Sequence, residues 1–347
     1  MTRWGIIGAG GIARVFANGV RFSSTGTLAA LASLTGGRRE AFASDFAIPR
    51  SYARYEDLLA DTEVDAVYIA VIHPLHAKCA VAAAEAGKHI LVEKPMGMNA
   101  REAAQMIEAA RRNDVFLMEA FMYRCHPQMA RLAELIRGGA IGDVLTIRST
   151  FSFSLPFDGS HRLYNKADGG GAILDVGCYP ASFARFAAGA AQQKPFVDPV
   201  GVKAFGVVGP SGVDTFTTAA VEFPGGIVAS LTCGISCPMP VEAAVFGTKG
   251  RLSLPNPWLP STPARTATMP LPMDTAWPSE RILLWTGDRT EPEEIVVTAD
   301  RDLYSYEADE VGRYIADRQA PAMSWDDSLG NMRLLDRWLD EAGSETS

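Results

Sequence analysis

A lysine after one apolar segment and a tyrosine in a later glycine-rich segment are the residues best suited to move a proton. Lys94 lies just beyond residues 89–92, which are strand-like, and α/β proteins place their sites at the carboxyl ends of parallel strands. A phenol is a poor base at its ordinary pKa of about 10, and a nearby ammonium lowers that pKa. We therefore expect Lys94 to activate Tyr179 as the base that takes the proton of an alcohol while a hydride leaves its carbon.

Asp175 lies four residues before Tyr179, so in a helix both side chains would project from one face. There Asp175 would bind substrate or orient Lys94. Pro180 leaves two local structures open: it either kinks the helix or is its first residue, with 169–177 as a glycine-rich lead-in. The predicted catalytic residues are Lys94, Tyr179 and Asp175, and the predicted substrate ligands are Asp175, Tyr179, Arg124 and Arg162, with His126 as a further candidate.

Each of these residue types also has an ordinary structural role. A lysine after a strand can be a surface residue, a tyrosine can pack in the core, and an aspartate can cap a helix. Arginines equally well form surface ion pairs. Among the aromatic residues of the segment from Phe151 to Tyr164, we expect those after Pro156, such as Phe157, to line a pocket, and those before it to pack the core.

A glycine-rich turn near the amino terminus could hold a pyrophosphate. Residues 8–13 read G-x-G-x-x-A between a strand-like and a helix-like segment. Gly8 would permit the tight turn and Gly10 would let the backbone approach the phosphates, which would rest on the helix amino terminus. A tight turn without a ligand is the alternative reading. The predicted phosphate-binding residues are Gly8, Gly10, Gly11 and Ile12.

The end of the second strand favours NADP over NAD. An NAD site usually carries an acidic residue about 20 residues after the turn, where it binds the ribose 2′-hydroxyl. Here no acidic residue occurs before Glu40, and the strand ends in SLTGGRR. Hydroxyl and guanidinium groups suit a 2′-phosphate, which a carboxylate would repel. Ser33, Thr35 and Arg38 are therefore predicted to bind that phosphate, although Arg38 and Arg39 could simply begin a solvated helix.

These residues belong to two differently patterned parts of the chain. Up to residue 120, strand-like and helical patterns alternate, which predicts a doubly wound parallel sheet. After about residue 123 the chain has short strands broken by Gly and Pro, which predicts a largely antiparallel sheet. The expected strands are 4–7, 28–34, 64–72, 89–92, 115–120, 144–153, 202–208, 216–223, 227–233 and 243–246; the expected helices are 12–22, 38–46, 56–60, 77–86, 103–112, 129–137, 303–315 and 328–339.

Composition excludes several classes of protein. Hydrophobic residues make up 48% and charged residues 21%, which is ordinary for a globular protein, and the net charge of −8 argues against a dedicated nucleic-acid binder. No segment is predicted to span a membrane, and the start of the sequence lacks a secretory signal, so we expect a cytoplasmic protein. The five cysteines lack CxxC spacing, so we expect reduced thiols and no metal site, with Cys233 and Cys237 as the one conceivable pair.

Five segments together resemble one enzyme family. They are the amino-terminal turn, VEKP at 92–95, LMEAFMYRCHP at 117–127, GGGAILDVGCY at 169–179 and DSLGNM at 327–332. In this order the set is similar to the glucose–fructose oxidoreductase, inositol dehydrogenase and MocA family over essentially the whole chain. Tyr179, where many members carry histidine, and HPLH at 73–76 resemble the branch of NADP-linked D-xylose dehydrogenases and dimeric trans-dihydrodiol dehydrogenases.

The resemblance implies a Rossmann domain over residues 1–122 and an α/β domain over residues 123–347. The second domain would bind substrate and use its open sheet to form a homodimer or larger assembly. The implied reaction is hydride transfer between a nicotinamide and a carbon of a sugar, polyol or diol, with no nucleic-acid or membrane partner. The implied cofactor contacts add His73, His76, Glu93 and Lys94, although His76 could instead bond only a backbone carbonyl.

Two other functions remain open at this point. A non-catalytic NADP-binding regulator is one, but a pure sensor has no chemical reason to keep Lys94, Asp175 and Tyr179 together. An enzyme that uses tightly bound cofactor for a transient oxidation is the other. The residues do not choose among individual sugars, polyols and diols, nor the direction of the reaction.

Overall fold

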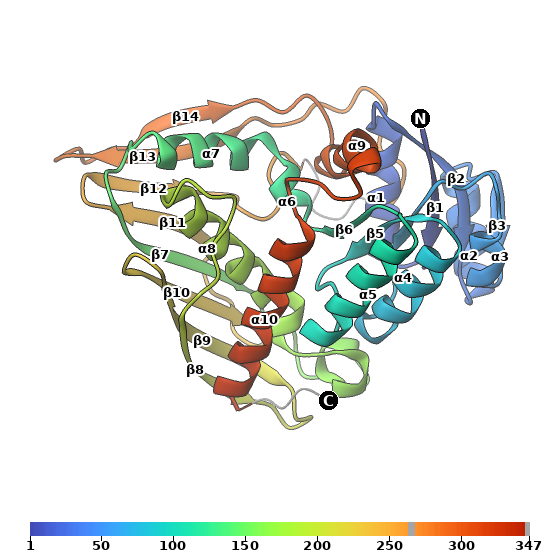
Figure 1. Cartoon of the computed structure of the whole chain (residues 1–347), viewed down its shortest axis with the longest axis horizontal. Coiled ribbons are helices and arrows are strands. Elements are labelled where there is room, and N and C mark those ends of the chain that lie inside the picture. Colours follow the sequence, from blue (N-terminus) through green and yellow to red (C-terminus); the bar gives the residue numbers. More distant parts are fainter. Residues whose placement is uncertain (263–267, 344–347) are drawn as a thin grey trace.

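Six parallel strands form the amino-terminal sheet in the order β3-β2-β1-β4-β5-β6, which is the order of a Rossmann domain. The computed structural model describes residues 1–262 and 268–343 (Figure 1). Strand β4 is buried at every position, as a strand covered by helices on both faces must be. The strands are β1 Thr2–Ile7, β2 Gly26–Ala32, β3 Arg50–Tyr52, β4 Ala66–Ile69, β5 His89–Glu93 and β6 Leu117–Ala120.

The helices of this unit begin and end where the local sequence dictates. The Asn99 side chain accepts a hydrogen bond from the Glu102 N–H and starts α5. Gly87 adopts a positive φ of 71° just after α4, a conformation that glycine takes without strain. The helices are α1 Gly11–Phe22, α2 Gly36–Asp45, α3 Tyr55–Leu59, α4 His76–Glu85 and α5 Ala100–Arg112.

Eight strands form the second sheet in the order β14-β13-β12-β11-β7-β10-β9-β8. Every neighbouring pair is antiparallel except β7 with β10. The predicted fold class, a doubly wound parallel sheet followed by a large, mostly antiparallel open sheet, is therefore confirmed. The strands are β7 Val144–Ser152, β8 Gly201–Val208, β9 Asp214–Phe223, β10 Ile227–Gly234, β11 Glu242–Gly247, β12 Gly250–Leu254, β13 Glu280–Thr286 and β14 Glu293–Val297.

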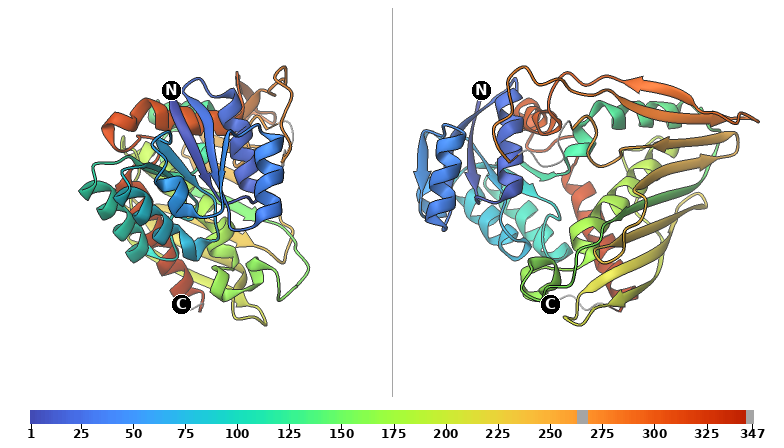
Figure 2. Two further views of the ribbon diagram at one scale, coloured as in Figure 1. Left: turned by 90° about the vertical axis from the view of Figure 1, so that its right-hand side faces the viewer. Right: turned by 180° about the vertical axis from the view of Figure 1, so that it is seen from behind.

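Helices cover one face of the second sheet, and Figure 2 shows no described helix on its other face. Helix α8 packs on β7 and β10, and α10 packs on β8. The helices of this half are α6 Met122–Cys125, α7 Pro127–Arg137, a π-helical turn Ile173–Gly177, α8 Cys178–Ala191, α9 Leu303–Tyr314 and α10 Trp325–Glu341. None of the described helices is long and apolar enough to cross a membrane.

The sequence did not predict β3, β12, β13 and β14. β13 and β14 form one edge of the sheet and carry charged residues such as Arg281, Glu293 and Glu294, which weaken the apolar alternation that marks a strand. The proline-rich stretch 255–278 contains no helix in its described part. Residues 263–267 of that stretch lie outside the described residues.

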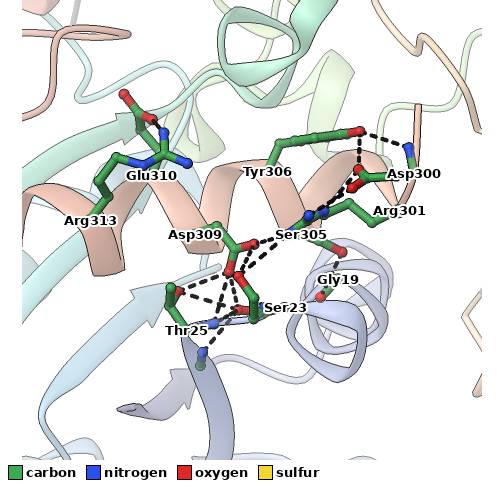
Figure 3. Close-up of polar contacts among 12 residues, drawn as sticks. Gly19, Ser23, Thr25, Asp300, Arg301, Ser305, Tyr306, Asp309, Glu310 and Arg313 are labelled. Atoms are coloured by element: carbon green, nitrogen blue, oxygen red, sulfur yellow. Dashed lines mark hydrogen bonds and ion pairs between the residues drawn. The ribbon is translucent and has the colours of Figure 1, made fainter. Parts of the chain in front are cut away.

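Helix α9 follows the second sheet in the chain but packs against α1 of the first unit. The Asp309 carboxylate accepts hydrogen bonds from the Ser23 hydroxyl and from the N–H and the hydroxyl of both Ser24 and Thr25. It also pairs with Arg301 at 2.7 Å (Figure 3). The helices approach closely because Gly19 leaves room, since a Cβ there would lie 2.4 Å from Tyr304. The sequence pattern had not indicated this contact.

Candidate active site

A cavity of about 940 Å³ opens where the two units meet. Its first wall is the carboxyl end of the parallel sheet, at the point between β1 and β4 where the strand order reverses, which is the usual ligand position in such sheets. Its second wall comes from β7, the π turn, α8 and the segment around Trp258. The predicted residues on the cavity wall are Gly8, Gly10, Gly11, Ile12, Ser33, Thr35, Arg38, His73, His76, Glu93, Lys94, Arg162, Asp175 and Tyr179.

The turn after β1 has the shape that a pyrophosphate requires. Gly8 has φ 110°, and a Cβ on it would lie 2.3 Å from the Ala70 carbonyl oxygen, so no larger residue fits. At Gly10 a Cβ would meet nothing within 4 Å, so the backbone there is open to an approaching ligand. No side chain caps the amino terminus of α1, which leaves its first N–H groups for an anion.

The end of β2 presents hydroxyl groups and one guanidinium to the cavity. Ser33, Thr35 and Arg38 line it, and Arg38 is exposed. Arg39 is engaged elsewhere, because its guanidinium donates to the Ser33 carbonyl at 3.0 Å and lies 3.6 Å from the Glu40 carboxylate. The two arginines therefore have different surroundings, and Arg38, the one predicted to bind the phosphate, is the one that lines the cavity.

Lys94 enters the site from the end of β5. Its ammonium donates a 2.6 Å hydrogen bond to the main-chain carbonyl of Asp175. Burial opposes the charge, but attraction to Asp175, Cys178 and Glu93 outweighs it, so the pKa of Lys94 is raised above its ordinary value. The lysine is therefore a charged donor at neutral pH.

The carbonyl that holds Lys94 belongs to the π-helical turn Ile173–Gly177, which runs directly into α8. Pro180, in the first turn of α8, has no N–H to donate back into this turn. Pro180 is therefore not the first residue of the helix, as one of the two alternatives had it, because α8 begins at Cys178 and the irregularity is the π turn before it. Single π turns inside helices are frequent at functional sites. Pro180 was the sequence signal for this turn, but the hydrogen bond between the Asp175 carbonyl and Lys94 was not predicted.

The Asp175 side chain is an ionised carboxylate. It pairs with Arg162 at 3.0 Å, and its own side chain is 9% exposed. Burial acts against the charge, but Lys94 and Arg162 overcome it, so the pKa of Asp175 lies below its ordinary value. Asp175 thus holds Lys94 through its main chain and Arg162 through its side chain.

The expectation that Lys94 lowers the pKa of Tyr179 is wrong in this structure. The ammonium lies 5.1 Å from the centre of the tyrosine ring, over its face, and the hydroxyl donates to the Met122 sulfur at 3.8 Å. Burial raises the pKa of Tyr179 well above its ordinary value. The reason is geometric: the main-chain carbonyl of Asp175 attracts the ammonium away from the phenol oxygen.

The two histidines are neutral parts of the wall. Burial lowers the pKa of His73 to about 3, and its Nδ1 lies 2.9 Å from the Gly169 carbonyl oxygen. Burial also lowers the pKa of His76, whose ring nitrogens face the Pro95 and Val71 carbonyls at 3.0 and 3.1 Å. A neutral imidazole has one N–H, so His76 donates to one of these two backbone carbonyls, and it also borders the cavity. Glu93 is buried there too, bonded to the Tyr68 hydroxyl, and burial raises its pKa.

Aromatic side chains form the wall opposite Lys94. Phe151 and Trp258 stack at 6.0 Å between ring centres, and Tyr179 packs at 5.6 Å from Trp258. The expectation for the aromatic segment is reversed, because Phe151 and Phe153 line the cavity whereas Phe157 packs on Tyr164 outside it. Trp258 was missed, since it lies in a proline-rich stretch that carries no periodic pattern.

Arg124 and His126 do not line the cavity. Arg124 forms a buried ion pair with Asp327 at 2.8 Å, and the two side chains are 3% and 2% exposed. His126 Nε2 lies 3.1 Å from the Ser261 hydroxyl. The expectation that Arg124 binds substrate is therefore corrected: its charge is neutralised inside the protein. Of the two arginines that were predicted to bind substrate, Arg162 is the one that lines the cavity, and its side chain is 44% exposed.

Comparison with known proteins matches both units. The oxidoreductase family model with an NAD-binding Rossmann fold, GFO_IDH_MocA, covers residues 2–121, and the GFO/IDH/MocA C-terminal domain covers residues 129–253. The chain belongs to the Gfo/Idh/MocA family. The predicted resemblance is thus confirmed, and this Gfo/Idh/MocA protein is an oxidoreductase with an NAD(P)-binding Rossmann domain.

Relatives of this Gfo/Idh/MocA oxidoreductase include a trans-1,2-dihydrobenzene-1,2-diol dehydrogenase of Mus musculus, 39% identical over 75% of this chain and 76% of the relative. An aldose-aldose oxidoreductase from Caulobacter crescentus has the same fold, with a TM-score of 0.83, 23% identity and coverage of 99% and 97% of the two chains. The 3-ketoreductase KijD10 from Actinomadura kijaniata, solved with NADP and TDP-benzene, superposes with a TM-score of 0.81 at 25% identity over 98% and 97%.

All five cysteines are free thiols, Cys233 and Cys237 included. Within residues 1–262 and 268–343, no cluster of His, Cys, Asp and Glu side chains is arranged to hold a metal ion.

Proposed function

We propose that this oxidoreductase is an NADP-dependent dehydrogenase or reductase acting on a hydroxyl-bearing carbon of a cyclic diol or an aldose. The observation that carries the proposal is the position of the Lys94 ammonium. It lies in the same cavity as the phosphate-binding turn and faces an aromatic wall. A cofactor and a small cyclic substrate would meet at that lysine.

The residues of the first wall fit a dinucleotide with a 2′-phosphate. Gly8, Gly10 and the uncapped start of α1 would receive the pyrophosphate. Ser33, Thr35 and Arg38 would bind the 2′-phosphate, and no carboxylate stands at the end of β2 to repel it. His73, His76 and Glu93 would border the nicotinamide end. The NADP bound to the related KijD10 is in keeping with this choice.

The bound nicotinamide would supply or accept the hydride, and the chain's own residues would handle the proton. Lys94, charged and held by Asp175, would donate a hydrogen bond to the substrate oxygen and stabilise negative charge that develops there. Tyr179 would present its hydroxyl as a second donor from the facing wall. Arg162, fixed by Asp175, would bind another substrate oxygen.

The second wall favours a substrate with an apolar face and two or more hydroxyls. Phe151, Phe153 and Trp258 offer flat apolar surfaces on which a ring can pack. Lys94, Asp175 and Arg162 offer polar partners on the other side. A cyclic vicinal diol or an aldose ring combines both features, and the dihydrobenzenediol on which the murine relative is named to act has them as well.

We also propose that the open face of the second sheet joins two copies of the chain. Phe205 is 88% exposed and Val207 58% exposed on β8, and Val228 is 46% exposed on β10. Strand β9 lies between these two strands in the sheet, and large exposed apolar side chains on one open face are typical of protein interfaces.

Turnover with a panel of substrates tests the proposed function. Trans-dihydrodiols, aldoses and inositols would be assayed with NADP and with NAD, following the nicotinamide absorbance. We expect oxidation of at least one cyclic diol or aldose, faster with NADP. No absorbance change with any member of the panel, in either direction, would contradict net oxidation and reduction by this protein.

A further inference from the structure

Asp214 is a buried carboxyl group that the proposed chemistry does not use, yet it contacts the turn that carries Asp175. It begins β9 and is 2% exposed. Its Oδ2 accepts a hydrogen bond from the Ile173 N–H at 2.7 Å, and the Ala172 N–H also bonds to it. Asp214 therefore caps the π turn and α8 from a neighbouring strand rather than from their own segment.

The contact between Asp214 and the turn leaves no spare room. A Cβ on Gly171 would lie 2.3 Å from the Asp214 Oδ1, and Gly171 has φ 111°. Only glycine permits both that backbone conformation and that approach. The Asp214 carboxylate is thus in close contact with the segment that leads into the π turn.

A short path leads from this cap to the proposed proton donor. Ile173, whose N–H Asp214 accepts, lies two residues before Asp175 in the same π turn. The Asp175 carbonyl accepts the hydrogen bond of the Lys94 ammonium at 2.6 Å. A shift of the turn would move that carbonyl and release the ammonium.

We propose that Asp214 is a positioning residue of this active site: through Ile173 it holds the π turn so that the Asp175 carbonyl keeps the Lys94 ammonium in place. The inference rests on the proposed role of Lys94. It adds to that role a residue from β9 that touches neither the cavity nor any of the proposed catalytic side chains.

The surroundings of Asp214 make this grip sensitive to pH. Burial raises the pKa of the Asp214 carboxyl to about 7, against the effect of the N–H groups that bond to it. Among the described residues, the titratable side chain that interacts with it is Cys233 on β10, whose thiol pKa is raised by burial, and no cation contributes to the pKa of Asp214. The ionised carboxylate accepts hydrogen bonds from the N–H groups at the helix amino terminus more strongly than the protonated carboxyl does. Asp214 therefore holds the π turn more firmly as pH rises through about 7.

Kinetics of Asp214→Asn test the proposal. Asparagine has nearly the same shape but no charge, so its single amide oxygen accepts hydrogen bonds from the two N–H groups more weakly. We expect kcat to fall about tenfold, the KM for NADP to stay unchanged, and the rise of kcat with pH near 7 to disappear. If kcat is unchanged, or if the rise near pH 7 persists in the variant, the proposal is overturned.

Asp302→Asn is the matched control. Asp302 is 3% exposed and likewise caps a helix, by accepting from the Tyr304 N–H at the start of α9. Tyr304 borders the cavity, but α9 carries none of the proposed catalytic residues and does not hold Lys94. We expect a comparable loss of thermal stability but an unchanged kcat and pH profile. The same kinetic loss in both variants would show that general loosening suffices, which would overturn a specific role for Asp214.

A readout without turnover separates this inference from the proposed function. The rate at which an amine-reactive acetylating reagent labels Lys94, followed by mass spectrometry, should rise severalfold in Asp214→Asn and not in Asp302→Asn. Asp214→Ser, which keeps one acceptor, should give an intermediate rate and serves if the asparagine variant does not fold. Unchanged labelling would overturn the positioning role, whereas increased labelling in a protein that turns over no substrate would contradict the proposed function alone.

Discussion

The ammonium of Lys94 points at the main-chain carbonyl of Asp175, 2.6 Å away, and passes over the ring of Tyr179 rather than beside its hydroxyl. The two residues that we expected to form an acid–base pair therefore meet through the ring face of Tyr179 and not through its phenol oxygen. Both keep their protons at neutral pH, because the pKa of each is raised. The site as it stands is built to donate protons.

Removing either proposed donor should slow the reaction strongly. Lys94→Ala and Tyr179→Phe should each lower kcat by about a hundredfold, the usual contribution of a positioned acid or base. The double variant should be little worse than either single one, because both donors would bind the same substrate oxygen and groups that act together on one atom are non-additive. Steady-state kinetics with NADP and the best substrate of the panel would measure this.

The affinity for NADPH provides the control for that experiment. Tyr179 is not part of the phosphate-binding turn, so Tyr179→Phe should bind NADPH as the parent protein does. If this variant instead keeps most of its turnover, the proton moves through another group, and Lys94 alone would be the donor to retain.

The rate should depend on pH differently in the two directions. Because the pKa of Lys94 lies above its ordinary value of about 10.5, the ammonium stays charged between about pH 8 and pH 9.5. Carbonyl reduction needs the charged form and should stay constant over that range, whereas alcohol oxidation needs a free base and should rise with pH. Initial rates in both directions would show it, and reduction that falls steeply from pH 8 would contradict Lys94 as the donor.

Arg38→Ala should weaken binding of NADP by tenfold or more and leave binding of NAD nearly unchanged. A guanidinium–phosphate contact exists only with the 2′-phosphate, and charged hydrogen bonds of this kind contribute about 1.5–3 kcal/mol. Arg39→Ala is the control, because the Arg39 guanidinium donates to the Ser33 carbonyl and does not line the cavity. Fluorescence titration with both reduced cofactors would measure the effect, and equal losses for both would refute a 2′-phosphate site.

The two predicted substrate arginines should separate into a stability residue and a binding residue. Arg124→Leu leaves the buried Asp327 with Arg185 as its remaining ion-pair partner, so unfolding in denaturant should become easier by about 3 kcal/mol while the substrate KM stays unchanged. Arg162→Leu should change stability by less than about 1 kcal/mol, because its side chain is 44% exposed, but should raise the substrate KM. The reverse pattern would restore Arg124 as a ligand.

Phe205→Asp should convert the protein to a monomer. The side chain is 88% exposed at the open face of the second sheet, where a charge would be buried unpaired in a dimer interface. Phe157→Asp, 55% exposed but outside that sheet, is the control. Light scattering at micromolar concentration would give both masses, and a monomeric parent protein would refute the assembly.

Local pattern determined the parts of this protein that depend on neighbouring residues in the chain. The GAGGIA turn places an open backbone at a helix amino terminus, and the short apolar strand before it and the Asn99 cap of α5 follow from short-range sterics and hydrogen bonding. For that reason the parallel first sheet, the largely antiparallel second sheet and the cavity positions of Gly8, Arg38, Lys94 and Asp175 could be predicted.

Tertiary contacts decided what no local pattern encodes. Arg124 and Arg162 are the same residue type, and only the buried Asp327, 203 residues away, makes one of them structural. Trp258 reaches the cavity from an aperiodic proline-rich segment, α9 returns to the first sheet through Asp309, and the pKa values of Tyr179 and Asp214 follow from burial. Burial and long-range charge pairing depend on which segments meet, and that is settled only when the whole chain has folded.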